Sequence, residues 1–276
     1  MKFKTSLSVL FCFLVLGSLA FAEEKLTAEQ IAKTMLELPV PDYSFATLIL
    51  DITEKNGKTE QYTLKEYGGG DNGLKNAVFV FTAPASVRDT RILQSEKTNK
   101  DDDKWVYQPS LRTTRRLGVG DRSKPFVGTE LTYNDMSTRK VGDDTHEMLS
   151  EEEKVTVTSA AYGSVTYTTW KLKETPIKAK ARDVEYAYRY VYIDKKTYLP
   201  VRYESYDKTG KLLKTMVIEK IDNIKGFEDY VLRRSVNVVN EVTGRTTHVT
   251  VKECTFDKKI SPAYFTQQFL STGKAK

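Results

Sequence analysis

The feature that most constrains the fold of this chain is a long succession of segments in which apolar and polar residues alternate. The alternation begins near Tyr43 and continues, with interruptions, to Phe256. A period of two places successive side chains on opposite faces of a strand. Short turn sequences such as Asn56-Gly57 and Asp207-Lys208-Thr209-Gly210 separate the segments. Because hairpin turns join antiparallel strands and no βαβ pattern occurs, we predict an antiparallel sheet.

The alternating segments add up to about ten strands with short turns between them. The clearest of them are expected at residues 45–53, 61–67, 185–194, 199–206, 211–221, 229–240 and 244–256. We therefore predict a mainly β (α+β) fold, in which residues 23–276 form a single domain. An antiparallel, strongly curved sheet or an open barrel, framed by a helix at each end, fits this pattern.

One helix is expected at each end of the strands. Thr27 and Gln30 have the spacing of a capping box, and Pro39 stops the helix that we expect from Leu26 to Leu38. A second helix is expected from Ala263 to Leu270, after a favourable cap. The first helix is amphipathic, and its sequence fits both a helix packed on the sheet and a helix that covers an apolar cavity.

Residues 1–22 have the three regions of a secretory signal peptide. Lys2 and Lys4 supply positive charge, Leu7 to Leu16 is apolar, and Ala20-Phe21-Ala22 is a cleavage pattern. We expect cleavage after Ala22 and export of the remaining chain across the inner membrane. Lipidation at Cys12 is not expected, because the bulky Phe11 precedes it.

The composition of the remaining chain excludes several classes of protein. Cys254 is then the only cysteine, so no internal disulfide can form and the fold depends on a hydrophobic core. The formal net charge of the full sequence is +6, which loses two charges with Lys2 and Lys4, and this mild excess does not indicate a nucleic-acid partner. No later segment has the apolar length of a membrane span.

Four tyrosines alternate along one expected strand. Tyr186, Tyr188, Tyr190 and Tyr192 would place four rings on one side of the sheet. Such a row can be cross-strand aromatic packing, or it can be the wall of a lipid-binding groove.

The segment from Trp105 to Asp135 combines aromatic residues, a basic strip and glycines. Arg112, Arg115, Arg116 and Arg122 follow the turn residue Pro109 within a short distance. This combination indicates a binding site or a lid, although a hairpin with a solvated basic face has the same appearance.

The residues for catalysis are not assembled in any recognisable pattern. The chain has two histidines and no C-x-x-C or G-x-S-x-G motif, and Gly118-x-Gly120 does not open a helix after a strand. Asp101 to Asp103 lack the spaced ligands of a calcium loop and are expected at a solvated hairpin tip. We therefore expect no enzyme activity, no metal site and no cofactor.

The residues of the basic segment resemble the outer-membrane lipoprotein-sorting proteins, in a LolA-like branch. The similarity consists of W-x-Y-x-P-x-L-R-x-x-R-R followed by G-D-R-S-x-x-F-x-G-x-x-x-T-Y-x-D, which here runs from Trp105 to Asp135. Weaker similarities lie in Tyr198 to Lys211 and in Pro262 to Leu270. Thr129-Glu130-Leu131 departs from the Ser-Asp-Phe that is usual in the family.

The resemblance implies an incomplete barrel whose helices cover a concave apolar face that holds acyl chains. It implies a periplasmic carrier that moves lipoproteins or other lipids toward the outer membrane, with an inner-membrane transporter as donor and an outer-membrane acceptor. No nucleic acid is expected as a partner, and the protein is expected to be a monomer. The candidate groove and lid residues are Trp105, Tyr107, Pro109, Arg112, Arg116, Asp121, Arg122, Phe126, Tyr133 and Asp135.

Other functions remain open at this point. The same fold could serve as a soluble accessory protein of a lipid-exporting membrane transporter, with the groove as a docking site. A surface adhesive β-protein could use the basic strip to bind acidic polymers.

Overall fold

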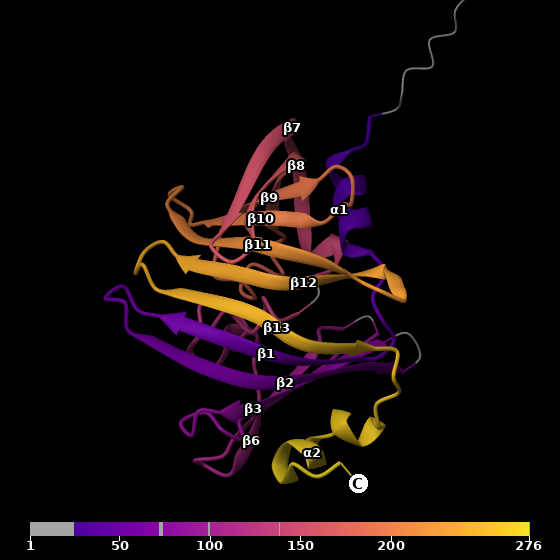
Figure 1. Cartoon of the computed structure of the whole chain (residues 1–276), viewed down its shortest axis with the longest axis vertical. Coiled ribbons are helices and arrows are strands. Elements are labelled where there is room, and N and C mark those ends of the chain that lie inside the picture. The colour runs from indigo at the N-terminus through magenta and orange to yellow at the C-terminus, as the bar shows by residue number, and fades with distance from the viewer. Residues whose placement is uncertain (1–24, 72–73, 99, 138, 276) are drawn as a thin grey trace, which may run out of the picture.

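The computed structural model describes residues 25–275 apart from 72–73, 99 and 138 (Figure 1). The expected signal peptide, its cleavage after Ala22 and Cys12 lie outside the described residues. None of the helices formed by the described residues has the length and apolar character needed to cross a membrane.

The described chain forms one antiparallel sheet of 13 strands, in the order β6-β5-β4-β3-β2-β1-β13-β12-β11-β10-β9-β8-β7. The strands are β1 (Ser44–Thr53), β2 (Thr59–Asp71), β3 (Leu74–Ala83), β4 (Arg91–Ser95), β5 (Asp103–Gln108), β6 (Thr113–Arg116), β7 (Asp144–Ser159), β8 (Gly163–Pro176), β9 (Tyr188–Asp194), β10 (Pro200–Tyr206), β11 (Leu212–Ile224), β12 (Phe227–Asn240) and β13 (Thr246–Phe256).

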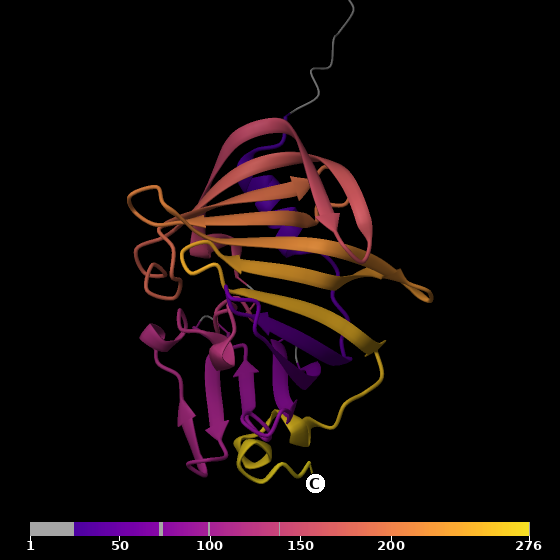
Figure 2. The ribbon, with the colours of Figure 1, turned by 60° about the vertical axis from the view of Figure 1, so that its left-hand side comes forward.

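Two meanders build this sheet, β1 to β6 and β7 to β13. They join where β1 pairs with β13, with Ala46 opposite Cys254 and Leu50 opposite Val249. Figures 1 and 2 show a sheet that curves strongly and does not close, because β6 and β7 remain as edges. The predicted open antiparallel half-barrel is confirmed.

The predicted number of strands was too small. The short β6 has the sequence Thr-Thr-Arg-Arg and shows no apolar alternation, since its side chains are largely exposed at an edge of the sheet. The edge strand β7 is long and highly charged, and irregularities in its pairing near Ser150 break its period. Edge strands bury little surface, so their sequences carry little of the apolar pattern.

Helix α1 (Ala28–Leu36) begins at a complete capping box. The side chain of Thr27 accepts a hydrogen bond from the Gln30 amide, and the Gln30 side chain accepts one from the Thr27 amide. The buried face of the helix, which includes Ile31 and Met35, packs on Trp170, Leu172, Val191 and Ile193 of β8 and β9. The helix therefore lies on one half of the concave face.

The C-terminal end covers the opposite, outer face of the sheet. The expected single helix is divided into a 3₁₀ turn (Pro262–Phe265) and α2 (Gln267–Thr272), because Thr266 is extended and caps α2. Phe269 and Leu270 of α2 pack on Val78 and Leu93. Arg91 also donates a hydrogen bond to the Leu270 carbonyl at 2.6 Å.

Residues 117–143, here called the crossing segment, connect edge strand β6 to edge strand β7 over the concave face. Three 3₁₀ turns, Val119–Asp121, Phe126–Gly128 and Val141–Asp143, shape it. Phe126 is fully buried, with its ring 5.4 Å from that of Phe79 and 5.7 Å from that of Phe81. The largest apolar core thus lies between the crossing segment and strands β1–β5, β12 and β13.

The tyrosine row lies mainly on the outer face. The rings of Tyr188 and Tyr190 lie 5.2 and 4.9 Å from that of Tyr206 on the neighbouring β10. Tyr192 donates a hydrogen bond to Glu204. Cross-strand packing is therefore the correct interpretation for these three tyrosines, whereas Tyr186 precedes β9 and is buried separately.

Candidate functional site

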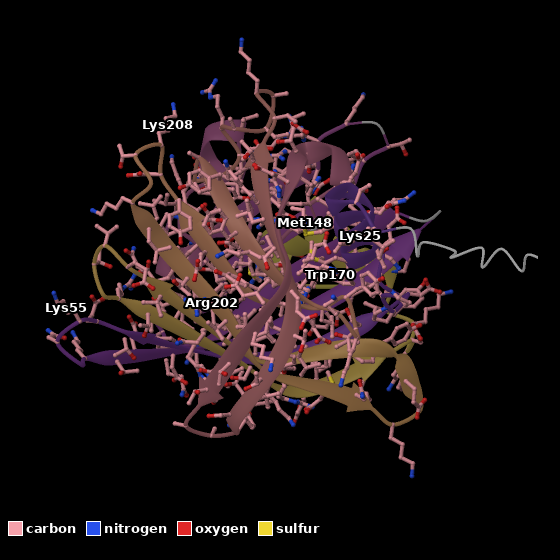
Figure 3. The ribbon with its side chains drawn as sticks, turned by 90° about the horizontal axis from the view of Figure 1, so that it is seen from above. Lys25, Lys55, Met148, Trp170, Arg202 and Lys208 are labelled. Atoms are coloured by element: carbon pink, nitrogen blue, oxygen red, sulfur yellow. The ribbon has the colours of Figure 1, made fainter. Side chains whose placement is uncertain are left out.

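A cavity of about 490 Å³ lies between α1, the crossing segment and the concave face. Its volume falls in the range of small-molecule pockets, roughly 300–1,000 Å³. The view from above in Figure 3 shows the sheet with its side chains, with Met148 and Trp170 near the covering helix. The cavity lies between the two apolar cores, one around Phe126 and one under α1.

One wall of the cavity is apolar. It comes from the end of α1 and the chain that follows, where Pro39 and Pro41 prevent further helix. Facing residues of the sheet complete the wall, and together the apolar lining residues are Met35, Leu36, Leu38, Pro39, Val40, Leu199, Met216, Val231, Leu232 and Val251. Val40 is 62% exposed, which places apolar surface at the outer end of this wall.

The floor of the cavity is polar, and Lys214 and Arg189 on it are paired with carboxylates. The Lys214 ammonium lies 2.6 Å from an Asp135 carboxylate oxygen and also contacts Glu185. Burial opposes the charge, but Asp135 and Glu185 raise the pKa of Lys214 to about 12. Arg189 bonds Glu174 at 2.6 Å and lies over the Tyr203 ring.

Glu66 of β2 is the exception on this floor. Its side chain makes no hydrogen bond or ion pair with any described residue, and it lines the cavity. Burial raises the pKa of Glu66 to about 7, from an ordinary value of 4.5. No charged neighbour offsets this, so the carboxyl group changes its charge near neutral pH.

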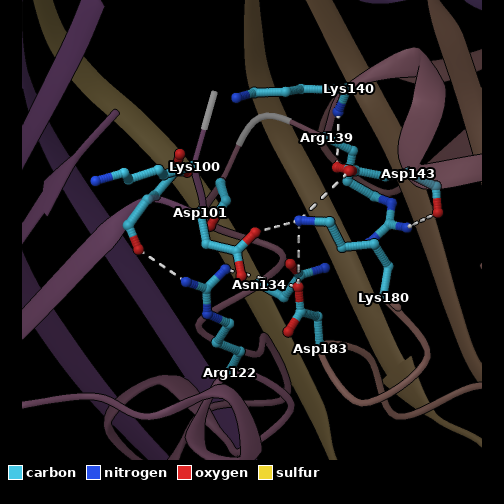
Figure 4. Close-up of a pocket in the computed structure, with 11 residues that line it drawn as sticks. Lys100, Asp101, Arg122, Asn134, Arg139, Lys140, Asp143, Lys180 and Asp183 are labelled. Carbon is cyan, nitrogen blue, oxygen red and sulfur yellow. Dashed lines mark hydrogen bonds and ion pairs between the residues drawn. The ribbon is translucent and has the colours of Figure 1, made fainter. Parts of the chain in front are cut away.

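A second cluster, shown in Figure 4, anchors the crossing segment beside the cavity. Arg122 donates to the Asp102 carbonyl at 2.7 Å and lies 3.6 Å from Asp183. Lys180 contacts Asp101 and Asp183 and lies 3.6 Å from Asp143. The space among these groups is about 20 Å³, which suits about one water molecule and no acyl chain. The cluster therefore ties three loops together.

The structure distributes the ten candidate residues over several places. Asp135 lines the cavity, and Arg122 belongs to the anchoring cluster. Phe126 and Tyr133 lie in the core under the crossing segment, with ring centroids 5.5 Å apart. Asp121 accepts hydrogen bonds from Lys124, Gly118 and Arg115, which lower its pKa to about 2 despite partial burial.

The remaining candidates lie away from the cavity. Trp105 and Tyr107 pack on the outer face, in the apolar cluster under α2. Pro109 and Arg112 lie in the turn between β5 and β6, and Arg116 pairs with Asp103 at the sheet edge. The basic strip is therefore an edge hairpin, and only its continuation into the crossing segment reaches the concave face.

Most cavity residues were not among the candidates, although two of them carried a signal. Glu66 continues the inward-facing series Tyr62 and Leu64 on β2. Lys214 begins the inward-facing series Met216 and Ile218 on β11. A charged residue at an inward position of an alternating strand marks a polar group inside the barrel.

Comparisons with known proteins agree with this architecture. A family model described as an uncharacterized protein matches residues 73–272. A crystal structure described as an outer membrane lipoprotein-sorting protein domain from Vibrio parahaemolyticus has a TM-score of 0.76 and 22% identity, covering 88% of this chain and 98% of that one. A DUF1329 family protein from Desulfovibrio piger has a TM-score of 0.76 and 24% identity, covering 88% and 97%.

A LolA superfamily protein from Nitrosomonas europaea has a TM-score of 0.65 and 20% identity, covering 89% of this chain and 100% of that one. No curated protein matches the chain. The family match spans most of the chain, and the matched structures share its open half-barrel. The chain belongs to the family that this model describes, and its fold is similar to those of the lipoprotein-sorting domain and the LolA superfamily protein.

Proposed function

We propose that this protein is a periplasmic carrier that holds the acyl chains of lipoproteins or other lipids and moves them toward the outer membrane. The observation that carries the proposal is the cavity of about 490 Å³ under α1, with its long apolar wall. Burial of an acyl chain gains about 0.8 kcal/mol for each CH₂ group, so such a wall can bind lipid without any reactive group.

Helix α1 and the chain after it are suited to act as a cover. The helix contacts the sheet through one apolar face, and its last turn borders the cavity. A bound chain and the closed cover would compete for the same apolar surface, so opening of α1 would couple to loading and release.

The crossing segment supplies the fixed side of this site. Asp135, Lys214 and Glu185 join it to β11 and to the chain before β9. Arg122 and Lys180 hold it from the other side. In this proposal the sheet and crossing segment form a rigid cradle, and α1 is the part that moves.

Native mass spectrometry of protein purified from the periplasm tests the proposal. We expect co-purified acyl lipid in the wild type and less of it in Val231→Trp, which fills the cavity. Val242→Trp is the matched control, because Val242 lies in the β12–β13 turn and is 52% exposed. Equal melting temperatures would show that both variants fold.

A wild-type protein that carries no lipid and binds no added fatty acid or phospholipid would overturn the proposal. If that lipid-free protein captured a membrane transporter, the accessory role would replace the carrier role. Equal lipid loading of the two tryptophan variants would show that lipid binds elsewhere.

A further inference from the structure

The charged side chains that line the cavity differ in whether they have partners. Lys214, Arg189 and Arg139 each lie 2.6 Å from a carboxylate oxygen. Glu66 and Arg233 line the same cavity and have no hydrogen bond or ion pair with any described side chain. The other cations of the cavity are therefore paired with carboxylates of the protein. The carboxyl group of Glu66 and the guanidinium group of Arg233 remain available to a ligand.

The surroundings of Glu66 are apolar on the sheet itself. Its neighbours in register are Ala46 on β1 and Phe79 on β3. The other titratable groups that line the cavity are Asp135, Arg139, Arg189, Tyr203, Lys214 and Arg233. None of them contributes to the raised pKa of Glu66, which is about 7 and is due to burial. A carboxylate in such a place gains most from a cation that a ligand supplies.

Arg233 lies across the concave face from Glu66. Strands β2, β1, β13 and β12 are consecutive in the sheet, so three steps separate the two residues. With neighbouring strands about 4.8 Å apart, strands β2 and β12 are about 14 Å apart along the sheet. Arg233 is exposed, whereas Glu66 is partly buried, and both line the cavity.

We propose that Glu66 and Arg233 form a headgroup subsite for a zwitterionic aminophospholipid, with Glu66 binding the ammonium group and Arg233 the phosphate group. This inference rests on the proposed lipid-carrier function and names the lipid class. The acyl chains would lie along the apolar wall, between Leu36 or Leu38 and Met216. An anionic lipid without an amine would leave Glu66 unpaired and would repel its carboxylate.

Binding of two short-chain phospholipids with identical acyl chains tests the subsite. The delipidated wild-type protein is titrated with phosphatidylethanolamine and with phosphatidylglycerol at pH 8, and heats of binding are measured. We expect about tenfold tighter binding of phosphatidylethanolamine, as for a charge-assisted hydrogen bond. Glu66→Gln should remove this preference, and Arg233→Gln should weaken both lipids equally.

Two controls and a pH series complete the experiment. Glu241→Gln and Arg182→Gln change exposed residues outside the cavity and should keep the preference. Because Glu66 loses its charge as pH falls through about 7, the wild-type preference should shrink at pH 5.5. Equal affinities for both lipids at pH 8, or an unchanged preference in Glu66→Gln, would overturn the subsite and leave the carrier function standing. Binding of neither lipid would overturn both.

Discussion

Lys214 shows how a charged residue can belong to the interior of a β-sheet protein. Its ammonium group lies between the carboxylates of Asp135 and Glu185, and all three are largely withdrawn from solvent. Burial acts to raise the pKa of Asp135, but the charge of Lys214 and the hydrogen bonds from Lys214 and Thr132 together lower it. These three charged side chains join parts of the chain that are far apart in sequence.

We predict that Lys214→Met destabilises the protein by about 3 kcal/mol at pH 7, because it leaves two buried carboxylates without a cation. The loss should be smaller at pH 5, where those carboxyl groups take up protons more readily. Urea unfolding at both pH values measures the effect. Lys208→Met, in the exposed β10–β11 turn, is the control and should change stability by less than about 0.5 kcal/mol. A loss of unfolding free energy as small as that of the control would contradict the structural role of the ion pairs of Lys214 with Asp135 and Glu185.

The ionised side chain of Glu66 should destabilise the folded protein, whereas Lys214 stabilises it. Its pKa is raised to about 7 in the folded state from an ordinary value of 4.5, so the unfolded chain releases the proton first. Ionisation therefore favours unfolding increasingly from about pH 4.5 to pH 7, by at most about 3 kcal/mol. Glu66→Gln should be more stable than the wild type at pH 8 and equally stable at pH 4. A pH-independent difference in urea midpoints would argue against the raised pKa.

At the scale of elements, α1 depends on its cap as well as on its apolar face. Thr27→Ala removes the side-chain acceptor of the capping box and should cost about 1 kcal/mol. Amide hydrogen exchange should then be faster throughout α1, while β8 and β9 keep their protection. Thr34→Ala on the exposed side of the same helix is the control. Unchanged exchange in α1 would show that packing alone holds the helix.

The packing of the crossing segment on the sheet depends on the ring of Phe126. Phe126 packs in the main core against Phe79 and Phe81, so Phe126→Ala should cost about 3–5 kcal/mol of folding free energy. Leu111→Ala, at an exposed turn position of the same region, should have little effect. Denaturant unfolding distinguishes the two variants. A loss below about 1 kcal/mol for Phe126→Ala would mean that the segment is not part of the core.

At the scale of the whole molecule, ligand binding and folding should be linked. A lipid that binds only the folded state at a hundred times its Kd adds about 2.7 kcal/mol to stability. We therefore predict that delipidated protein melts at a lower temperature and that added phospholipid restores it. Val231→Trp should respond less to added lipid than Val242→Trp. If added lipid raised the melting temperatures of both variants equally, the stabilising site would lie outside this cavity.

The alternation of side chains, the hairpin turns and the capping box of Thr27 and Gln30 are local signals, and from them the sequence by itself determined the antiparallel pairing and the first helix. It also indicated a binding site or a lid in residues 105–135, which stays a prediction, and it did not indicate where these residues lie in the fold. Whether an edge such as β6 or β7 pairs, which face Trp105 or Glu66 occupies, and which carboxylate meets Lys214 depend on contacts across the whole sheet. Only the tertiary structure decided these, because curvature brings β2, β11 and β12 around one hollow while their residues are far apart in the chain.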